Sequence, residues 1–428
     1  MSSKTKLLLV AAVFALSTGK AAAATPSPLT VEAAVEQALA ANAGLAAAQA
    51  QARADTHRPP QAGALPDPVL SLNVLNMPVD TFDLTREPMT QIQIGISQGV
   101  PFPGKRALRR DAAQSDARAV TAQADETRLE LIRDVRQTWW NLFYLDRALE
   151  VVMRNQDLLR QFITVAQTKY RVGRGLQQDI LLGELELSKL LDLELQFQRQ
   201  RRAWEARLNA LLNRSIETTV RLPHKVSEAL PDVGTETDLL AMADGLRPRL
   251  ITMQHRIDAA ETRRELARKE LLPDFKLGAA YGVRQGDNPT GGDRPDFASV
   301  MFSLNLPVYA GKKQYKAIDQ RTSELQRSVF MLQDVRRQIH AAISASLTEY
   351  TKTREQAALF KQGIIPQARQ TVSSMLAGFQ VGKVDFLNLI NAQLTLYNYQ
   401  IQYWKTLSQA NQALARLAAA VGKESIHE

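Results

Sequence analysis

The sequence predicts a mainly α-helical chain with a smaller membrane β part, in which one structural unit occurs twice. Three observations lead to this fold class: an internal duplication, a very long helical stretch in each copy, and paired segments in which apolar and polar residues alternate. The chain has 428 residues, of which 45% are hydrophobic and 23% charged, as in ordinary globular proteins. It has no cysteine, which excludes disulfides, thiolate metal sites and cysteine nucleophiles.

The N-terminus has the pattern of a secretory signal. Lys4 and Lys6 precede the apolar run 7–16, and the small residues 21–24 predict cleavage after Ala24. The mature chain is therefore expected to be exported, with its formal charge reduced from +9 to +6 by the loss of three lysines. An exported chain of modest charge is not expected to bind nucleic acid. There is no cysteine at the cleavage site for a lipid anchor, and no second apolar run approaches the roughly 20 residues of a transmembrane helix.

The duplication appears when the chain is compared with itself. Residues 170–174 (YRVGR) correspond to 379–383 (FQVGK), an offset of 209, and the match continues without a gap to residues 208 and 417. Upstream the offset is near 206, with Pro66-Asp67 matching Pro273-Asp274. Residues 100–105 (VPFPGK) likewise match 306–312 (LPVYAGK). The chain is therefore two copies of one unit.

Each unit contains a predicted helical hairpin. Apolar residues recur every three or four positions over about 105–169 and 312–378, where the one proline is Pro366. Helices of some 65 residues are roughly 100 Å long, which favours coiled-coil packing. Shorter helices are predicted to return over about 176–212 and 384–421, and another over 249–272 after an irregular linker. The glycines at 173 and 382 mark the tips of the hairpins.

Alternating segments lie between the helical parts. Residues 91–98 alternate strictly, 299–306 do so apart from Met301, and 69–76 and 275–283 do so less cleanly, which predicts two β-hairpins with long polar loops. Strands of about nine residues with one apolar face suit a transmembrane barrel, although a soluble, half-buried sheet has the same pattern. Export without a lipid anchor and the neighbouring long helices favour the barrel. Four strands cannot close one, so the barrel must be shared, with eight, twelve or sixteen strands from two, three or four chains.

These predictions divide the chain into nine parts. They are a signal peptide (1–24), an N-terminal segment with an equatorial and upper helix (25–64), β-hairpin 1 (65–100), helical hairpin 1 (101–212), an equatorial linker (213–248), an upper helix (249–272), β-hairpin 2 (273–307), helical hairpin 2 (308–422) and a C-terminal tail (423–428).

Taken together, these features resemble the outer membrane efflux protein family, the TolC-like outer membrane factors. The likeness covers essentially the whole mature chain and includes both tips, the run 391–398 (NAQLTLYN) and the segment 101–106 (PFPGKR). It implies a homotrimer with a shared twelve-stranded outer-membrane β-barrel and an α-helical periplasmic coiled-coil tunnel. It also implies docking to a periplasmic adaptor and an inner-membrane pump. The segment 101–106 resembles the branch that serves heavy-metal cation pumps of the resistance-nodulation-division type.

The resemblance implies a passive exit duct and not an enzyme, and no catalytic motif is present. Two alternatives stay open. The same channel fold could serve drug efflux or type I protein secretion, because the pump chooses the passenger. The chain could also be a non-conducting periplasmic coiled coil that spaces the envelope layers.

Family resemblance places adaptor contacts at the two hairpin tips, where the glycines also serve a helix–helix turn. The tip residues are Tyr170, Val172, Gly173, Arg174, Phe379, Val381, Gly382 and Lys383. Some relatives carry an acidic ring near the second tip as a cation-selective constriction. Here the matching positions are Asn388 and Asn391. Asp179 and Asp385 lie nearby and could supply charge, but capping and the helix dipole explain them equally well.

Two basic clusters follow the β-hairpins, where long helices begin. We hypothesise that they contact anionic headgroups of outer-membrane lipid, although a solvated rim is the alternative. The clusters contain Lys105, Arg106, Arg109, Arg110, Lys312, Lys313 and Lys316.

No metal site or cofactor is expected. The histidines have no ligand spacing between them; they are His57, His224, His255, His340 and His427. Trp139, Trp140 and Trp204 occupy helical positions and are predicted to pack between helices.

Overall fold

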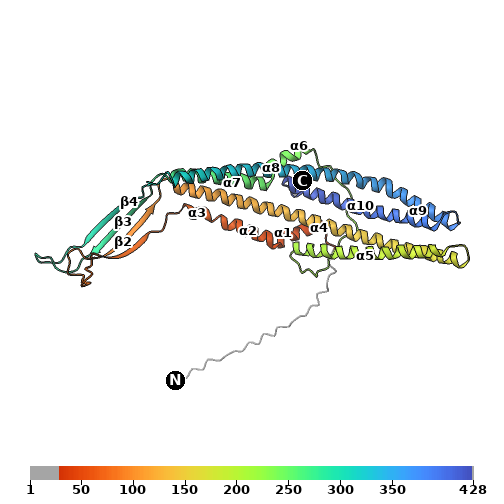
Figure 1. Cartoon of the computed structure of the whole chain (residues 1–428), viewed down its shortest axis with the longest axis horizontal. Helices are drawn as coiled ribbons and strands as arrows, with labels where there is room; N and C mark the ends of the chain where they lie inside the picture. Colours follow the sequence, from red (N-terminus) through yellow and green to blue (C-terminus); the bar gives the residue numbers. More distant parts are fainter. Residues whose placement is uncertain (1–27, 427–428) are drawn as a thin grey trace, which may run out of the picture.

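The computed structural model of the protein describes residues 28–426. The predicted signal peptide lies outside these residues. The molecule is elongated, with a β-sheet at one end and the tips of two helical hairpins at the other (Figure 1). The chain returns to the middle of the helical body at its C-terminal end (Figure 1).

Both units contain short helices, then two strands, then a long outgoing helical stretch and a returning helix. The first contains α1 (Val31–Ala41), α2 (Ala43–Asp55), α3 (Arg58–Gly63), β1 (Val69–Leu75), β2 (Gln91–Val100), α4 (Lys105–Arg171) and α5 (Gln177–Leu211). The second contains α6 (Glu236–Leu246), α7 (Pro248–Lys269), β3 (Phe275–Val283), β4 (Phe297–Leu304), α8 (Gln314–Leu359), the π-helix η1 (Phe360–Ile364), α9 (Ile365–Gln380) and α10 (Phe386–Val421).

The sheet has four antiparallel strands in the order β1-β2-β3-β4. The central pair, β2 and β3, joins the two units, with Ile96 opposite Ala279. One face carries apolar side chains along all four strands, and most are exposed. Leu72 is 74% exposed, Ile94 51% and Val300 89%. A sheet with two open edges and an exposed apolar face lacks the partners that it needs in water or in lipid.

The long helix α4 is the axis of the helical body. At 67 residues it is roughly 100 Å long, and it packs against α5, α7 and α10. Its core is aromatic at mid-length, where the Trp139 and Phe143 rings stack with centroids 5.5 Å apart. Trp139 and Trp140 are buried, as predicted for packing residues. No helix among the described residues is both long and apolar enough to cross a membrane.

One local expectation is wrong. The linker 213–248 is expected to be irregular, but α6 occupies Glu236–Leu246. Thr235 caps that helix by accepting a hydrogen bond from the Asp238 amide, and Leu239 and Ala243 are fully buried.

The second outgoing stretch is helical without a gap from Gln314 to Gln380, as predicted. It widens into a π turn just before Pro366, which has no amide hydrogen and whose ring crowds a preceding carbonyl.

Candidate functional site

The two hairpin tips have the same backbone structure. Gly173 and Gly382 have φ of 71° and 75°, a region that L side chains rarely adopt. At each tip the amide after the glycine donates back to the end of the outgoing helix: Arg174 to the Lys169 carbonyl and Lys383 to the Gly378 carbonyl, both at 2.9 Å. This is the Schellman arrangement, in which a left-handed residue closes a helix. A Cβ on either glycine would meet no atom within 4 Å, so backbone conformation is the requirement for glycine there.

The exposed surface of the tips is apolar at its centre. Val172 is 64% exposed and Val381 69%, while Tyr170 is 47% exposed. Arg174 and Lys383 are also exposed. Phe379 differs, since only 5% of it is exposed and its ring packs on Phe386 with centroids 5.4 Å apart. Phe379 is therefore a packing residue in the single chain. Its side chain is too buried there for the direct adaptor contact that was predicted for it.

Within one chain, the tips of the two hairpins contact each other. The Lys169 ammonium lies 3.9 Å from the Phe379 ring centroid and donates a hydrogen bond to the Phe379 carbonyl. Further along the hairpins, the Gln393 side chain donates to Asn155, and both residues are buried. Sequence reasoning missed Lys169, Gln393 and Asn155, because no local pattern shows which residues of two hairpins come together.

Three of the four predicted constriction residues lie on one face at the start of α10. Asp385, Asn388 and Asn391 are exposed, whereas Phe386, Leu389 and Ile390 on the other side are buried. Asp385 occupies the N-cap position, but its side chain makes no capping hydrogen bond. Asp179 lies in the first turn of α5 and is half-buried. Both carboxylates are thus at positive helix ends, where the helix dipole favours negative charge.

The first strand–helix junction corrects one prediction. Lys105 was a candidate for contact with lipid headgroups, but its side chain is only 1% exposed. Its ammonium donates at 2.8 Å to both the Asp274 carboxylate and the Leu272 carbonyl, and it lies 3.4 Å from Glu270. Lys105 is therefore neutralised inside the chain and cannot reach a membrane surface.

The other residues of the two clusters differ in exposure. Arg106 donates to the Gly63 carbonyl at 2.9 Å, and Arg109 lies 3.3 Å from Glu270. Arg110 is mostly exposed and pairs with its neighbour Asp111. In the second cluster Lys312, Lys313 and Lys316 are all exposed, and Lys316 pairs with Asp319 at 3.1 Å. The second junction thus presents more free positive charge than the first.

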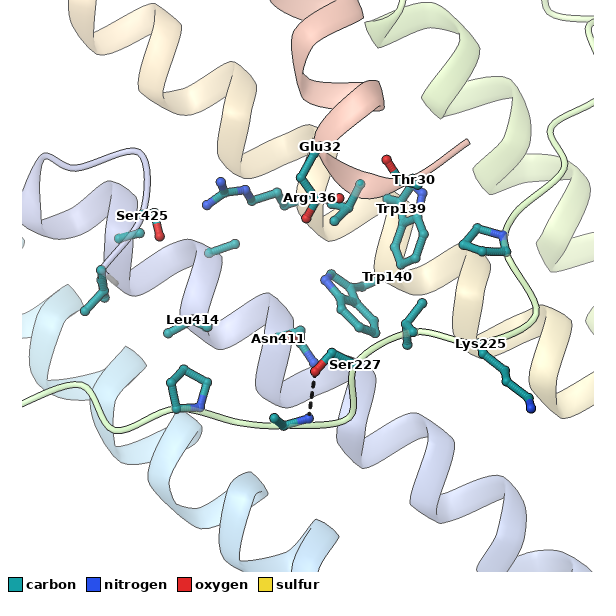
Figure 2. A pocket seen from close by; sticks show the side chains of 18 residues that line it. Thr30, Glu32, Arg136, Trp139, Trp140, Lys225, Ser227, Asn411, Leu414 and Ser425 are labelled. Atoms are coloured by element: carbon teal, nitrogen blue, oxygen red, sulfur yellow. Dashed lines mark hydrogen bonds between the residues drawn. The ribbon is translucent and has the colours of Figure 1, made fainter. Parts of the chain in front are cut away.

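A cavity of about 570 Å³ lies at mid-height, between α4, α10 and the linker before α6. Trp139 and Trp140 form one wall, and Asn411 and Leu414 of α10 form another (Figure 2). The Trp139 indole donates to the Leu29 carbonyl at 2.9 Å, which holds the start of the described chain against α4. The cavity therefore belongs to the packing of the equatorial segments.

The described histidines do not gather into a metal-binding group. Among residues 28–426 there is no group of three or more His, Cys, Asp or Glu side chains placed to hold a metal ion. His224 and His340 each face a single carboxylate, Glu150 and Asp244, and His427 lies outside the described residues.

The model of the outer membrane efflux protein family matches residues 34–214 and 239–423, so this chain belongs to that family. The family assignment made from the sequence is therefore confirmed.

Several relatives are similar over most of the chain. The cobalt-zinc-cadmium resistance protein CzcC of Cupriavidus metallidurans is 23% identical over 92% of this chain and 90% of its own length. The alkaline protease secretion protein AprF of Pseudomonas aeruginosa is 22% identical over 68% of this chain and 61% of its own.

Solved structures share the fold. The outer-membrane channel OprN superposes with a TM-score of 0.77 at 16% identity, covering 92% of this chain and 89% of its own. The outer membrane protein VceC of Vibrio cholerae gives 0.77 at 18% identity, covering 92% of this chain and 96% of its own. CusC, studied for transmembrane channel formation, gives 0.76 at 14% identity and covers 93% of each chain. The predicted fold class is confirmed.

Proposed function

We propose that this protein is the outer-membrane exit duct of a tripartite efflux system, passive and without enzymatic activity. It is exported with its signal peptide (1–24) removed, and it assembles as a homotrimer with a twelve-stranded barrel. The observation that carries the proposal is the exposed apolar face of a four-stranded sheet with two open edges, joined to helices roughly 100 Å long. Such a sheet is stable in a bilayer only when other chains close it.

The proposal gives each part a place. Residues 65–100 and 273–307 form the barrel, and 101–212 and 308–422 form the periplasmic tunnel. Residues 25–64, 213–248 and 249–272 surround the tunnel at its equator and upper part, and 423–428 form a tail. The junction residues Arg110, Lys313 and Lys316, which are exposed, contact anionic lipid headgroups.

The open end of the tunnel docks a periplasmic adaptor, which connects it to an inner-membrane pump of the resistance-nodulation-division type. Exposed Tyr170, Val172 and Val381 provide an apolar contact surface at the tips, and Arg174 and Lys383 add positive charge beside it. A non-conducting coiled coil that only spaces the envelope layers would need no such docking surface.

For the passenger we propose heavy-metal cations. The similarity to a cobalt-zinc-cadmium resistance protein over 92% of this chain supports the assignment, together with the PFPGKR segment at 101–106. Protein secretion is the second candidate, supported by the similarity to a protease secretion protein over 68% of the chain.

The test is a deletion strain of the native host, grown with a panel of metal cations, hydrophobic drugs and bile salts. We expect hypersensitivity confined to metals, restored by the wild-type gene. Complementation with Val172→Asp plus Val381→Asp should fail although the channel still assembles, because charge disrupts an apolar docking surface. The matched control is Leu195→Asp, a similarly exposed apolar position at mid-helix of α5. Sensitivity to drugs alone would overturn the metal assignment, and no sensitivity at all would overturn the efflux function.

A further inference from the structure

We propose that neighbouring copies of this chain are joined by an ion pair between Lys312 of one copy and Asp67 of the next, beside a β4–β1 strand pair of defined register. The inference rests on the homotrimer proposed above, and it adds the residues that form the contact between copies. We call this contact the seam.

Inside the chain, the first unit contacts the second where α4 and β3 begin. The buried Lys105 ammonium donates to Asp274 at 2.8 Å, and the Phe102 amide donates to the same carboxylate oxygen at 2.8 Å. The Phe102 ring lies beside Phe275, with centroids 6.1 Å apart. These hydrogen bonds to Asp274 and the contact between the two rings hold the start of α4 against the start of β3.

The internal duplication repeats the residues of this contact elsewhere in the chain. Asp67 follows Pro66 as Asp274 follows Pro273, an offset of 207, and Lys312 follows Gly311 as Lys105 follows Gly104, the same offset. The backbone agrees at the second site. The Lys105 amide donates to the Phe102 carbonyl at 3.1 Å, and the Lys312 amide donates to the Tyr309 carbonyl at 3.1 Å. Tyr309 is therefore the counterpart of Phe102, and Asp67 is the counterpart of Asp274.

These counterparts are exposed and unpaired within the described chain. Asp67 and Lys312 are both exposed, and neither makes an ion pair in residues 28–426. The Tyr309 amide donates to no acceptor in that part of the chain, and the tyrosine itself is 77% exposed. At the junction of Lys105 and Asp274 these groups are paired and partly buried. Their counterparts Lys312 and Asp67 are exposed, unpaired in the described part of the chain and opposite in charge.

The missing partner must be a second copy. Asp67 precedes β1 and Lys312 follows β4, and these strands are the two edges of the sheet. When a second copy adds its β1 to the open β4, its Asp67 reaches the Lys312 junction as Asp274 reaches Lys105. The proposal assigns Lys312 to the seam and leaves Lys313 and Lys316 for lipid.

The duplication also sets the register of the seam strands. Residues of β1 correspond to residues 207 positions later in β3, and residues of β2 to residues 206 positions later in β4. The β1–β2 pair Leu72–Ile94 therefore corresponds to the β3–β4 pair Ala279–Val300, and the structure contains both pairs. Applied to the observed β2–β3 pair Ile96–Ala279, these offsets place Phe302 of one copy opposite Leu72 of the next. Both side chains are exposed on the apolar face in the single chain, at 59% and 74%. The predicted register thus continues the apolar band across the seam.

The ion pair is tested by charge reversal in the full-length protein, purified in detergent and measured by light scattering. We expect Asp67→Lys and Lys312→Glu each to speed trimer dissociation about tenfold or more, because each places like charges together in a contact that is buried in its internal counterpart. The double variant Asp67→Lys plus Lys312→Glu should restore the wild-type rate. The control is Glu87→Lys, the same charge change at an exposed acid in the outer loop.

The register is tested by disulfides, since the chain has no cysteine of its own. Leu72→Cys with Phe302→Cys should cross-link copies upon oxidation, whereas Val74→Cys with Phe302→Cys, shifted by two residues, should not. Preferential linking of the shifted pair overturns the register. The ion pair is overturned if Asp67→Lys and Lys312→Glu dissociate no faster than Glu87→Lys, or if the double variant does not restore the wild-type rate. In either case a trimeric wild type leaves the proposed function standing. A monomeric wild type in detergent overturns both.

Discussion

At the scale of single residues, one carboxylate fastens the equatorial linker to the helical body. Glu228 accepts hydrogen bonds from Lys361 at 2.6 Å and from the Tyr403 hydroxyl. Burial opposes ionisation of Glu228, but these two hydrogen bonds and the Lys361 charge outweigh it and hold the pKa below its ordinary value of 4.5. At this point Glu228 joins the linker to η1 through Lys361 and to α10 through Tyr403.

The sign of the pH effect follows from this shift. A carboxyl group with a lowered folded-state pKa stabilises the fold fully above its ordinary value of 4.5, and the contribution is lost as pH falls through the folded-state pKa. We therefore expect thermal unfolding of the wild type to lose more stability between pH 6 and pH 3 than Glu228→Gln does. The measurement is the unfolding temperature of both proteins across that range. Equal pH dependence in the two proteins contradicts the assignment.

At the scale of elements, α10 separates polar from apolar residues with helical spacing. The buried side fits against the first hairpin, and the exposed side carries Asp385, Asn388 and Asn391. An exposed row near the tunnel end is where fixed charge would select ions by sign. The two asparagines make most of this row neutral, so the channel is expected to have weak ion selectivity of its own.

Asn388→Asp plus Asn391→Asp should raise the preference for cations over anions several-fold, because it adds two carboxylates to each chain where the row is exposed. Reversal potentials in planar bilayers under a salt gradient measure this preference. Leu191→Asp plus Leu195→Asp is the control, since both leucines are exposed on α5 and the variant also adds two carboxylates to each chain. An equal shift in the control would indicate a general charge effect and not an effect of the row on α10.

At the scale of the whole molecule, the two hairpins are held together at their far ends. Lys169 of α4 covers the Phe379 ring of α9 and donates to the Phe379 carbonyl, so this contact joins the tips of the two units. A cation–π contact contributes about 0.5–2 kcal/mol, depending on its exposure. On the proposed function, we expect the duct to open by separation of the hairpins at their tips, and this contact then favours the closed arrangement.

Lys169→Ala should increase the open probability of the isolated channel by about fivefold, which corresponds to about 1 kcal/mol. Single-channel recording in planar bilayers is the measurement. Arg171→Ala is the matched control: Arg171 is basic, exposed and near the same tip, but its side-chain contact is with Thr168 of its own helix. Equal open probability of the Lys169 variant and the wild type would contradict a role of this contact in closure.

The sequence predicted most of the fold because the relevant signals are local or repeated. Spacing of three and four residues predicted α4, and strict alternation predicted β2. Glycine at 173 and 382 predicted the tips, since few other residues adopt that backbone region. The helix α6 was missed because a proline- and glycine-bearing segment hides an eleven-residue helix, although Thr235 provides its cap.

The duplication, the kinds of elements, the family and the candidate positions at the tips follow from the sequence alone. The exposure of each of these residues depends on how the chain folds. Lys105 and Lys312 stand in matching Gly-Lys motifs, yet one is buried against Asp274 and the other is open. The reason is physical: the partner of Lys105 lies 169 residues away, and only folding places it there, whereas Lys312 lies at the open edge of the chain. Local sequence determines the path of the backbone, and long-range contacts determine the environment of each charge.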